Sequence, residues 1–201
     1  ATYDFGTNKV IDVHTNVRKG PRLTIHTYSV DYSERHWIGT LHGLYEYLPE
    51  LDTFVSNDLG QSLLQERIVK IEPLKNGGLL LGSRGKGVIY YNQDTCFSIG
   101  TKEGLASDMI RDIHIDERGN IWIATLTGLS KLSFGGLEQA DYSYTLRTFG
   151  VQHGLFSDEI YDIEVLPNML RPNIISNQMP ESKLGISIPN QTYWAKMNKD
   201  N

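Results

Sequence analysis

The stretch "NIWIATLTGLSKL" (residues 120–132) predicts two short β-strands joined by a tight turn, because apolar residues alternate through it and Gly128 lies where the chain turns back. Aligning the chain on this stretch reveals two further copies, "HWIGTLHGLYEYL" (36–48) and "LLLGSRGKGVIYY" (79–91). The small residues Gly39, Gly82 and Ala124 of the three copies lie 43 and 42 residues apart. A period of this length is typical of one four-stranded blade of a β-propeller.

The residues before each copy agree as well, in "IHTYSVDYSERHWIGT" from Ile25, "IVKIEPLKNGGLLLGS" from Ile68 and "IRDIHIDERGNIWIAT" from Ile110. In the third copy the alternation predicts strands at 110–115, after a one-residue shift, at 121–125, at 128–132 and near 145–149. The longer spacing to the next segment predicts an extended hairpin around "FGGLEQADY". Four consecutive antiparallel strands repeated about an axis make the predicted fold class an all-β propeller.

The repeat divides the chain into blades at 24–66, 67–109 and 110–159, with a degenerate or partial blade and tail at 160–201. "KLGISIPNQTYWAKM" is interpreted as a degenerate hairpin of that last blade. Residues 1–23 are interpreted as outer strands of a preceding or closing blade. Either these strands complete a small closed ring or the chain is a piece of a larger propeller, and the second interpretation is favoured because propellers usually have four to eight blades.

Composition excludes several classes of protein. The net charge of -5, from 19 basic and 24 acidic residues, argues against a nucleic-acid partner. No segment is apolar for long enough to span a membrane, and the single cysteine, Cys96, excludes an internal disulfide. The chain contains neither a His-Glu-x-x-His nor a Gly-x-Ser-x-Gly motif, so we expect no metal, no cofactor and no enzyme activity.

The unit "GLASDMIRDIHIDERGNIWIATLTGLSKL" (104–132) resembles the two-component regulator propeller repeat, through its Gly-Leu-x-Ser connector, its Asp-x-x-Gly turn and its Trp-Ile-Ala-Thr strand. Looser matches extend the resemblance over roughly residues 24–165. The resemblance implies a periplasmic sensor propeller of a hybrid two-component system of the Bacteroidetes type. It also implies that the membrane span and the histidine kinase lie outside this chain, and that the ligand is a glycan.

Two groups of residues in the repeat have a structural interpretation. Trp37 and Trp122 recur at one repeat position that Leu80 fills in the middle copy, so we expect them to pack between blades. The repeated glycines follow strands without preceding helices, so they are interpreted as turn residues rather than a phosphate-binding loop.

Positions that differ between copies are free to bind a ligand. Propeller ligands usually lie at the axial entrance, which is formed by the connectors between blades and the starts of the inner strands. The ligand-binding residues predicted at that entrance are His26, Arg67, Asp108, Arg111, Asp112, Asp158 and Tyr161, with Gln65 and Lys70 beside them. His42, Arg84 and Lys86, in the turns between second and third strands, form a secondary group of which Arg84 is the strongest candidate.

The expected partners are a small-molecule or oligosaccharide ligand and further propeller blades or a second copy, including a homodimer. Two other functions stay open at this point. One is a protein-interaction scaffold, and the other is a polysaccharide lyase or hydrolase built on a propeller.

Overall fold

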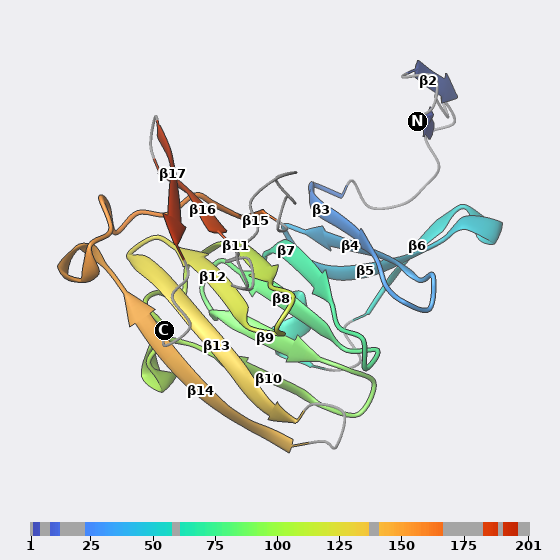
Figure 1. The fold of residues 1–201 in the computed structure, drawn as a ribbon. Coiled ribbons are helices and arrows are strands. Elements are labelled where there is room, and N and C mark those ends of the chain that lie inside the picture. The colour runs from blue at the N-terminus through green and yellow to red at the C-terminus, as the bar shows by residue number, and fades with distance from the viewer. Residues whose placement is uncertain are drawn as a thin grey trace, which may run out of the picture.

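The computed structural model describes residues 2–4, 9–12, 23–57, 61–136, 141–166, 183–188 and 191–196. Within these residues the chain forms three four-stranded antiparallel sheets followed by a three-stranded sheet (Figure 1). In each of them the strands pair in chain order, as expected for propeller blades.

The first sheet contains β3 (Ile25–Val30), β4 (His36–Thr40), β5 (Gly43–Leu48) and β6 (Thr53–Ser56). The second contains β7 (Ile68–Pro73), β8 (Leu79–Ser83), β9 (Val88–Tyr91) and β10 (Cys96–Ile99). The third contains β11 (Ile110–Ile115), β12 (Ile121–Thr125), β13 (Gly128–Gly136) and β14 (Asp141–Phe149). The last contains β15 (Asp162–Leu166), β16 (Lys183–Ile188) and β17 (Gln191–Lys196).

Short helical turns lie beside these strands. They are η1 (Pro49–Leu51), η2 (Ser62–Gln65), η3 (Thr101–Glu103) and η5 (Val151–His153), and the last three lie in the connectors between sheets. Near the N-terminus β1 (Thr2–Asp4) and β2 (Lys9–Asp12) pair only with each other among the described strands.

The first strands of successive sheets pack side by side, β3 against β7, β7 against β11 and β11 against β15. The small residue of each second strand permits this approach. A Cβ added at Gly39 would lie 2.8 Å from the side chain of Ile68, and one added at Gly82 would lie 2.8 Å from that of Ile110. Ala124, at the same repeat position, packs against Ile160. The repeat of small residues therefore sets the distance between neighbouring blades.

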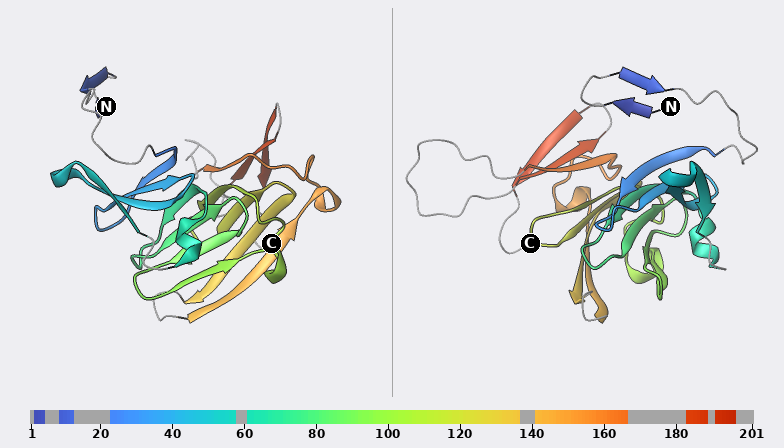
Figure 2. Two further views of the ribbon diagram at one scale, coloured as in Figure 1. Left: turned by 180° about the vertical axis from the view of Figure 1, so that it is seen from behind. Right: turned by 90° about the vertical axis from the view of Figure 1, so that its right-hand side faces the viewer.

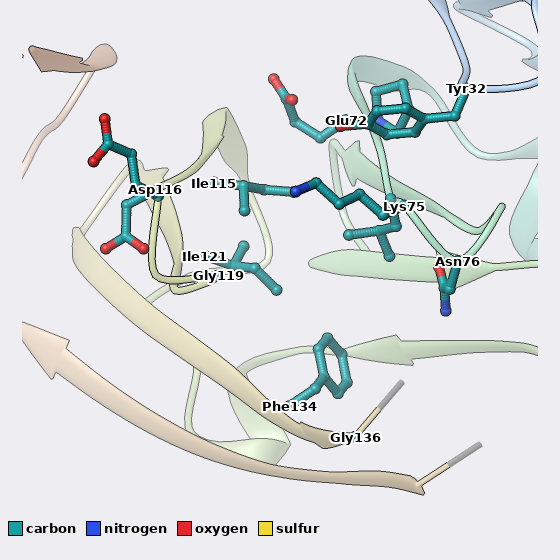
Figure 3. Close-up of a pocket in the computed structure, with 13 residues that line it drawn as sticks. Tyr32, Glu72, Lys75, Asn76, Ile115, Asp116, Gly119, Ile121, Phe134 and Gly136 are labelled. Carbon is teal, nitrogen blue, oxygen red and sulfur yellow. The ribbon is translucent and has the colours of Figure 1, made fainter. Parts of the chain in front are cut away.

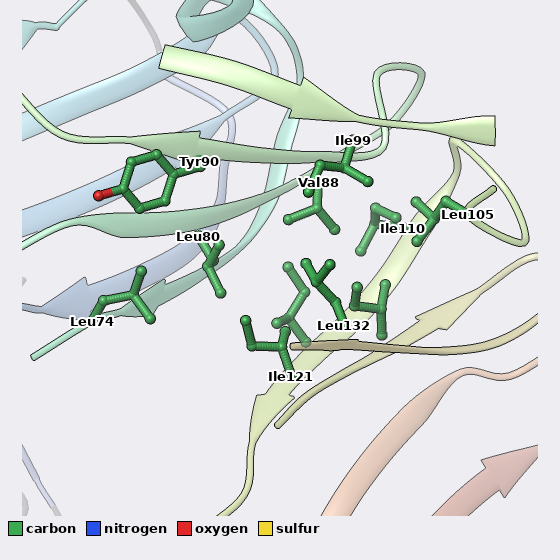
Figure 4. Packing of buried hydrophobic residues seen from close by; sticks show 11 residues of the cluster. Leu74, Leu80, Val88, Tyr90, Ile99, Leu105, Ile110, Ile121 and Leu132 are labelled. Atoms are coloured by element: carbon green, nitrogen blue, oxygen red, sulfur yellow. The ribbon is translucent and has the colours of Figure 1, made fainter. Parts of the chain in front are cut away.

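Each interface between blades has its own apolar core. The largest, between the second and third sheets, includes Leu80, Tyr90, Ile113 and Leu132 (Figure 4). Trp37 packs with Ile71 and Tyr91 of the second sheet, and Trp122 packs with Ile160 and Ile163 of the last. Trp37 and Trp122 are 1% and 5% exposed, so the prediction that they fill the space between blades is confirmed.

An aspartate at the start of the turn between first and second strands holds each tryptophan. The Oδ2 of Asp31 accepts a hydrogen bond from the indole nitrogen of Trp37 at 2.9 Å, and the Oδ2 of Asp116 accepts one from that of Trp122 at 3.1 Å. The same carboxylates accept backbone N–H groups of their own turns. In the second sheet Leu74 and Leu80 occupy both positions and pack in one core. The aspartate and the tryptophan are thus replaced together in the second sheet, so no buried indole N–H is left there without an acceptor.

The strands of the third sheet begin and end where the alternation predicts, except that β13 and β14 are longer. Their pairing continues from Leu129–Phe149 to Gly136–Asp141, beyond the ends of β11 and β12 (Figure 2). Phe134 and Tyr142 on this extension contact Tyr90, and Tyr142 also contacts Phe97. These aromatic contacts with the second sheet account for the longer hairpin.

The last sheet contains the predicted hairpin, with Lys183–Ile188 paired to Gln191–Lys196. Residues 167–182 of the predicted partial blade lie outside the described residues, as do most of residues 1–23. No helix in the described parts of the chain is long and apolar enough to cross a membrane.

Candidate ligand-binding site

A β-bulge opens the first strand of each four-stranded sheet. The register shifts between Ile25 and Thr27, between Ile68 and Lys70 and between Ile110 and Asp112, so His26, Val69 and Arg111 are the extra residues. A bulge leaves its extra residue unpaired and turns the side chain out of the regular alternation. This bulge explains the one-residue shift in the apolar alternation of the first strand. Tyr161, at the equivalent position, directly precedes β15.

Three arginines from different segments gather at this end of the blades. Arg67 ends a connector, Arg84 follows β8 and Arg111 occupies a bulge. The Nε of Arg67 donates to the Nε2 of His26 at 3.1 Å. Burial lowers the pKa of His26, and the positive charges of Arg67 and Arg84 lower it further. Burial likewise lowers the pKa of Arg84, with added repulsion from Arg111 and Arg67. The three guanidinium groups therefore act on one another and on His26.

Arg111 also contacts the last sheet. Its Nη2 donates to the Oε1 of Glu159 at 3.1 Å, and its guanidinium lies 4.8 Å from the centre of the Tyr161 ring. A hydrogen bond to Glu159 raises the pKa of Tyr161. The Nε atoms of Arg84 and Arg111 are buried and have no partner among the described residues. An N–H donor left in this state costs about 1–3 kcal/mol, so the site carries unused hydrogen-bonding capacity.

A layer of charges lies on the first strands next to this cluster. The Nζ of Lys70 lies 2.8 Å from the Oδ1 of Asp112 and 3.2 Å from the Oε1 of Glu72, while the Oδ2 of Asp112 accepts the backbone N–H of Ile163 at 3.0 Å. Burial acts to raise the pKa of Asp112, but hydrogen bonds with Asp162 and Lys70 and the charge of Lys70 outweigh it and hold that pKa low. The hydrogen bond with Asp112 raises the pKa of Asp162. Both oxygens of Asp112 are thus occupied within the protein.

Two other predicted site residues hold the connectors. Asp108 accepts hydrogen bonds from the backbone and hydroxyl groups of Thr101, at 2.7 Å and 3.0 Å. Asp158 accepts one from the backbone of Val151 at 2.7 Å. Both carboxylates cap the helical turn that follows a glycine, so the repeat uses them for its own backbone.

The structure therefore brings together His26, Arg67, Arg84, Arg111 and Tyr161, and places Asp108, Asp112 and Asp158 in contacts with their own surroundings. Gln65, His42 and Lys86 are exposed residues near the same end. Glu159 was missed at the sequence level, although it occupies the repeat position of Arg67 and differs from it. That difference between copies is the signal that would have identified it.

A hollow lies at the opposite end of the blades, where first strands turn into second strands. Its volume is about 570 Å³, and its lining includes Tyr32, Glu72, Lys75, Asp116 and Phe134. Tyr32 and Phe134 lie on opposite sides of it in Figure 3. The sequence pattern indicated no site here, because these residues lie in turns and strands that the repeat explains. The described residues hold no cluster of His, Cys, Asp and Glu able to bind a metal.

Comparison with known proteins agrees with this architecture. Residues 104–127 match the family model described as two component regulator propeller, which confirms the resemblance at the repeat that carries it. No curated protein matched the chain.

Several solved structures are similar to the chain, among them the following three. The extracellular domain of the putative hybrid two component system BT3049 from B. thetaiotaomicron is 19% identical, with a TM-score of 0.59 over 96% of this chain and 25% of that one. The corresponding domain of BT4673 from B. thetaiotaomicron is 18% identical, with a TM-score of 0.56 over 90% and 23%. Virginiamycin B lyase from Staphylococcus aureus is 7% identical, with a TM-score of 0.53 over 89% and 57%.

The chain is therefore a set of all-β propeller blades. Its fold is related to the extracellular regions of hybrid two-component systems, and it spans about a quarter of the length of the two domains from B. thetaiotaomicron.

Proposed function

We propose that this chain is a ligand-sensing segment of a periplasmic two-component sensor propeller, and that it binds a glycan or another small polar ligand. The main supporting observation is that His26, Arg111 and Tyr161 occupy one repeat position in three blades but differ in chemistry. They lie together with Arg67 and Arg84 at one axial end of the blades. Donors beside an aromatic ring suit a saccharide. The response would be passed to a kinase outside this chain.

The uncovered face of the first sheet supports a larger propeller. Ile25 and Tyr28 are 52% and 54% exposed, whereas their repeat equivalents Ile68 and Ile71 are 0% and 3% exposed. Each buried equivalent contacts the second strand of the preceding blade. The proposed occupant of this face is therefore a preceding blade of the same kind, and a second copy of this chain is the alternative outcome of a test of its oligomeric state.

The neighbouring carboxyl groups of Asp112 and Asp162, on the first strands of the third and last sheets, do not favour a catalytic function. Asp112 is buried, and its two oxygens are held by Lys70 and by the backbone of Ile163. We accordingly propose a binding role without catalysis, and no nucleic-acid partner in view of the net charge of -5.

The direct test is thermal unfolding and titration calorimetry of the full 201-residue chain against defined oligosaccharides from several plant and host glycans. A ligand present at 100 times its Kd should stabilise the fold by about 2.7 kcal/mol. Tyr161→Ala should weaken binding, whereas Arg118→Ala, an exposed change in a turn at the opposite end of the blades, should not. Failure of every oligosaccharide to bind would reject the glycan proposal.

A further inference from the structure

The arginine cluster, defined as Arg67, Arg84 and Arg111, carries more positive charge than its surroundings neutralise. Glu159 pairs with Arg111, and in the described parts of the chain no carboxylate pairs with Arg67 or Arg84. The partner of Arg67 is the neutral acceptor nitrogen of His26.

The carboxylates that the sequence predicted for this site are already engaged. Asp108 bonds to Thr101, Asp158 bonds to Val151, and Asp112 bonds to Lys70. Among the described residues, the three guanidinium groups therefore form one ion pair with a carboxylate, that of Arg111 with Glu159.

The donors that remain are of the kind that binds an acid. A guanidinium binds a carboxylate or sulfate through parallel N–H groups, and the Nε is one donor of such a pair. The Nε atoms of Arg84 and Arg111 are shielded from solvent and have no protein acceptor in the described structure. The contact with Tyr161 and the bond to Glu159 hold the guanidinium of Arg111 in one orientation.

We propose that the arginine cluster binds the acidic group of the ligand, a carboxylate or a sulfate, so that the ligand is an acidic saccharide. This inference rests on the proposed function, since the exposed ring of Tyr161 supplies the adjoining surface for a sugar. A neutral ligand would leave the like charges of the three arginines together with no counter-ion. An acidic group offsets that repulsion and supplies the missing acceptors.

The test compares ligands that differ only in charge. Trigalacturonic acid and its fully methyl-esterified form share one skeleton, and a sulfated disaccharide with its desulfated form is a second pair. We expect the acidic member of at least one pair to bind the full chain at least 10-fold more tightly than its neutral counterpart. Raising the salt concentration should reduce that preference.

Arg84→Gln tests whether the cluster is responsible, and Arg147→Gln removes the same charge from an exposed position on the outer strand β14. The first variant should lose most of the preference for the acid, about 10-fold, while the second retains it. Circular dichroism and the Tm of each variant would verify that it folds. Arg111→Gln provides a second test if Arg84→Gln does not fold.

The outcomes separate the two proposals. Equal affinity for both members of both pairs would overturn the acidic-ligand inference and leave the glycan function standing. If no saccharide binds, the glycan function fails. Titration with sodium sulfate and sodium acetate then tests whether the arginine cluster binds an anion. If sulfate or acetate raises the Tm of the chain and Arg84→Gln abolishes that increase, the result supports an anion-binding site at the arginine cluster. If neither anion raises the Tm, the anion-binding site is overturned.

Discussion

Ile25 in the first sheet and Ile68 in the second occupy the same position of the repeat, yet Ile25 is half exposed and Ile68 is fully buried. The difference arises from the neighbouring blade. Ile68 packs against the space left by Gly39 of the preceding sheet, whereas no described strand covers Ile25 in this way. Burial in a propeller is therefore a property of the interface between repeats, and among the described strands the first repeat packs against one neighbouring repeat.

The turns of the second and third sheets differ in a complementary way. Asp116 and Trp122 form a buried polar pair, while Leu74 and Leu80 replace them in the second sheet. The two solutions fill equivalent space, but only the first depends on a hydrogen bond. These two comparisons, between covered and uncovered faces and between polar and apolar turns, lead to the two predictions with the largest expected effects.

The largest effect is expected from a pair of isoleucine truncations. Ile68→Ala should reduce the free energy of unfolding by about 2–5 kcal/mol, because it opens a cavity between two blades. Ile25→Ala should reduce it by roughly 1 kcal/mol or less, because that side chain is already half in water. Urea denaturation followed by tryptophan fluorescence measures both. Equal losses would mean that something covers the first sheet in solution.

A smaller effect is expected when the polar turn is broken. Asp116→Ala should cost about 2–3 kcal/mol, because the buried indole N–H of Trp122 and two backbone N–H groups lose their acceptor. The double variant Asp116→Leu with Trp122→Leu copies the second sheet and should cost less than the sum of its single changes. Glu117→Ala, exposed in the same turn, is the control and should be neutral. Additive losses in the double variant would show that the two positions are independent.

The smallest effect is expected from the charged layer that contains Lys70 and Asp112. The residue at their repeat position in the first blade is Thr27, which carries no charge. The lowered pKa of Asp112 means that its ionised form stabilises the fold above the ordinary pKa of 3.8, and that this contribution disappears as the pH falls through the lowered value. Lys70→Met removes a cause of that shift, so acid unfolding should begin at higher pH.

The ionised form of Asp162 has the opposite effect on stability, because a raised pKa means that this form is unfavourable in the folded protein at neutral pH. Asp162→Asn should therefore leave stability at pH 7 unchanged or raise it by about 0.5 kcal/mol, a small figure because Asp162 is exposed to screening solvent. Glu164→Gln is the control on the same strand. Acid titration of the fluorescence signal measures these shifts, and a destabilised Asp162→Asn variant would contradict the assignment.

Much of the blade was predictable from the sequence because every copy repeats the same local requirements. Alternation predicted the strands, the spacing of Gly39, Gly82 and Ala124 predicted the blade period, and the shared position of Trp37 and Trp122 predicted their burial. The hydrogen bonds that Trp37 and Trp122 donate to Asp31 and Asp116 were not predicted, because the five residues between each pair say nothing about side-chain direction. The spacing predicted that the hairpin of β13 and β14 is extended, but not its aromatic contacts with the second sheet.

The sequence by itself determined the class of fold, the blade period and the set of variable residues that includes His26, Arg67, Arg84, Arg111 and Tyr161. Only the tertiary structure decided which of these meet and which, such as Asp108 and Asp158, bind their own connectors. The reason is that strand patterns follow from local backbone geometry, whereas the arginine cluster forms across segments up to 44 residues apart. Its geometry exists only once the blades pack against one another.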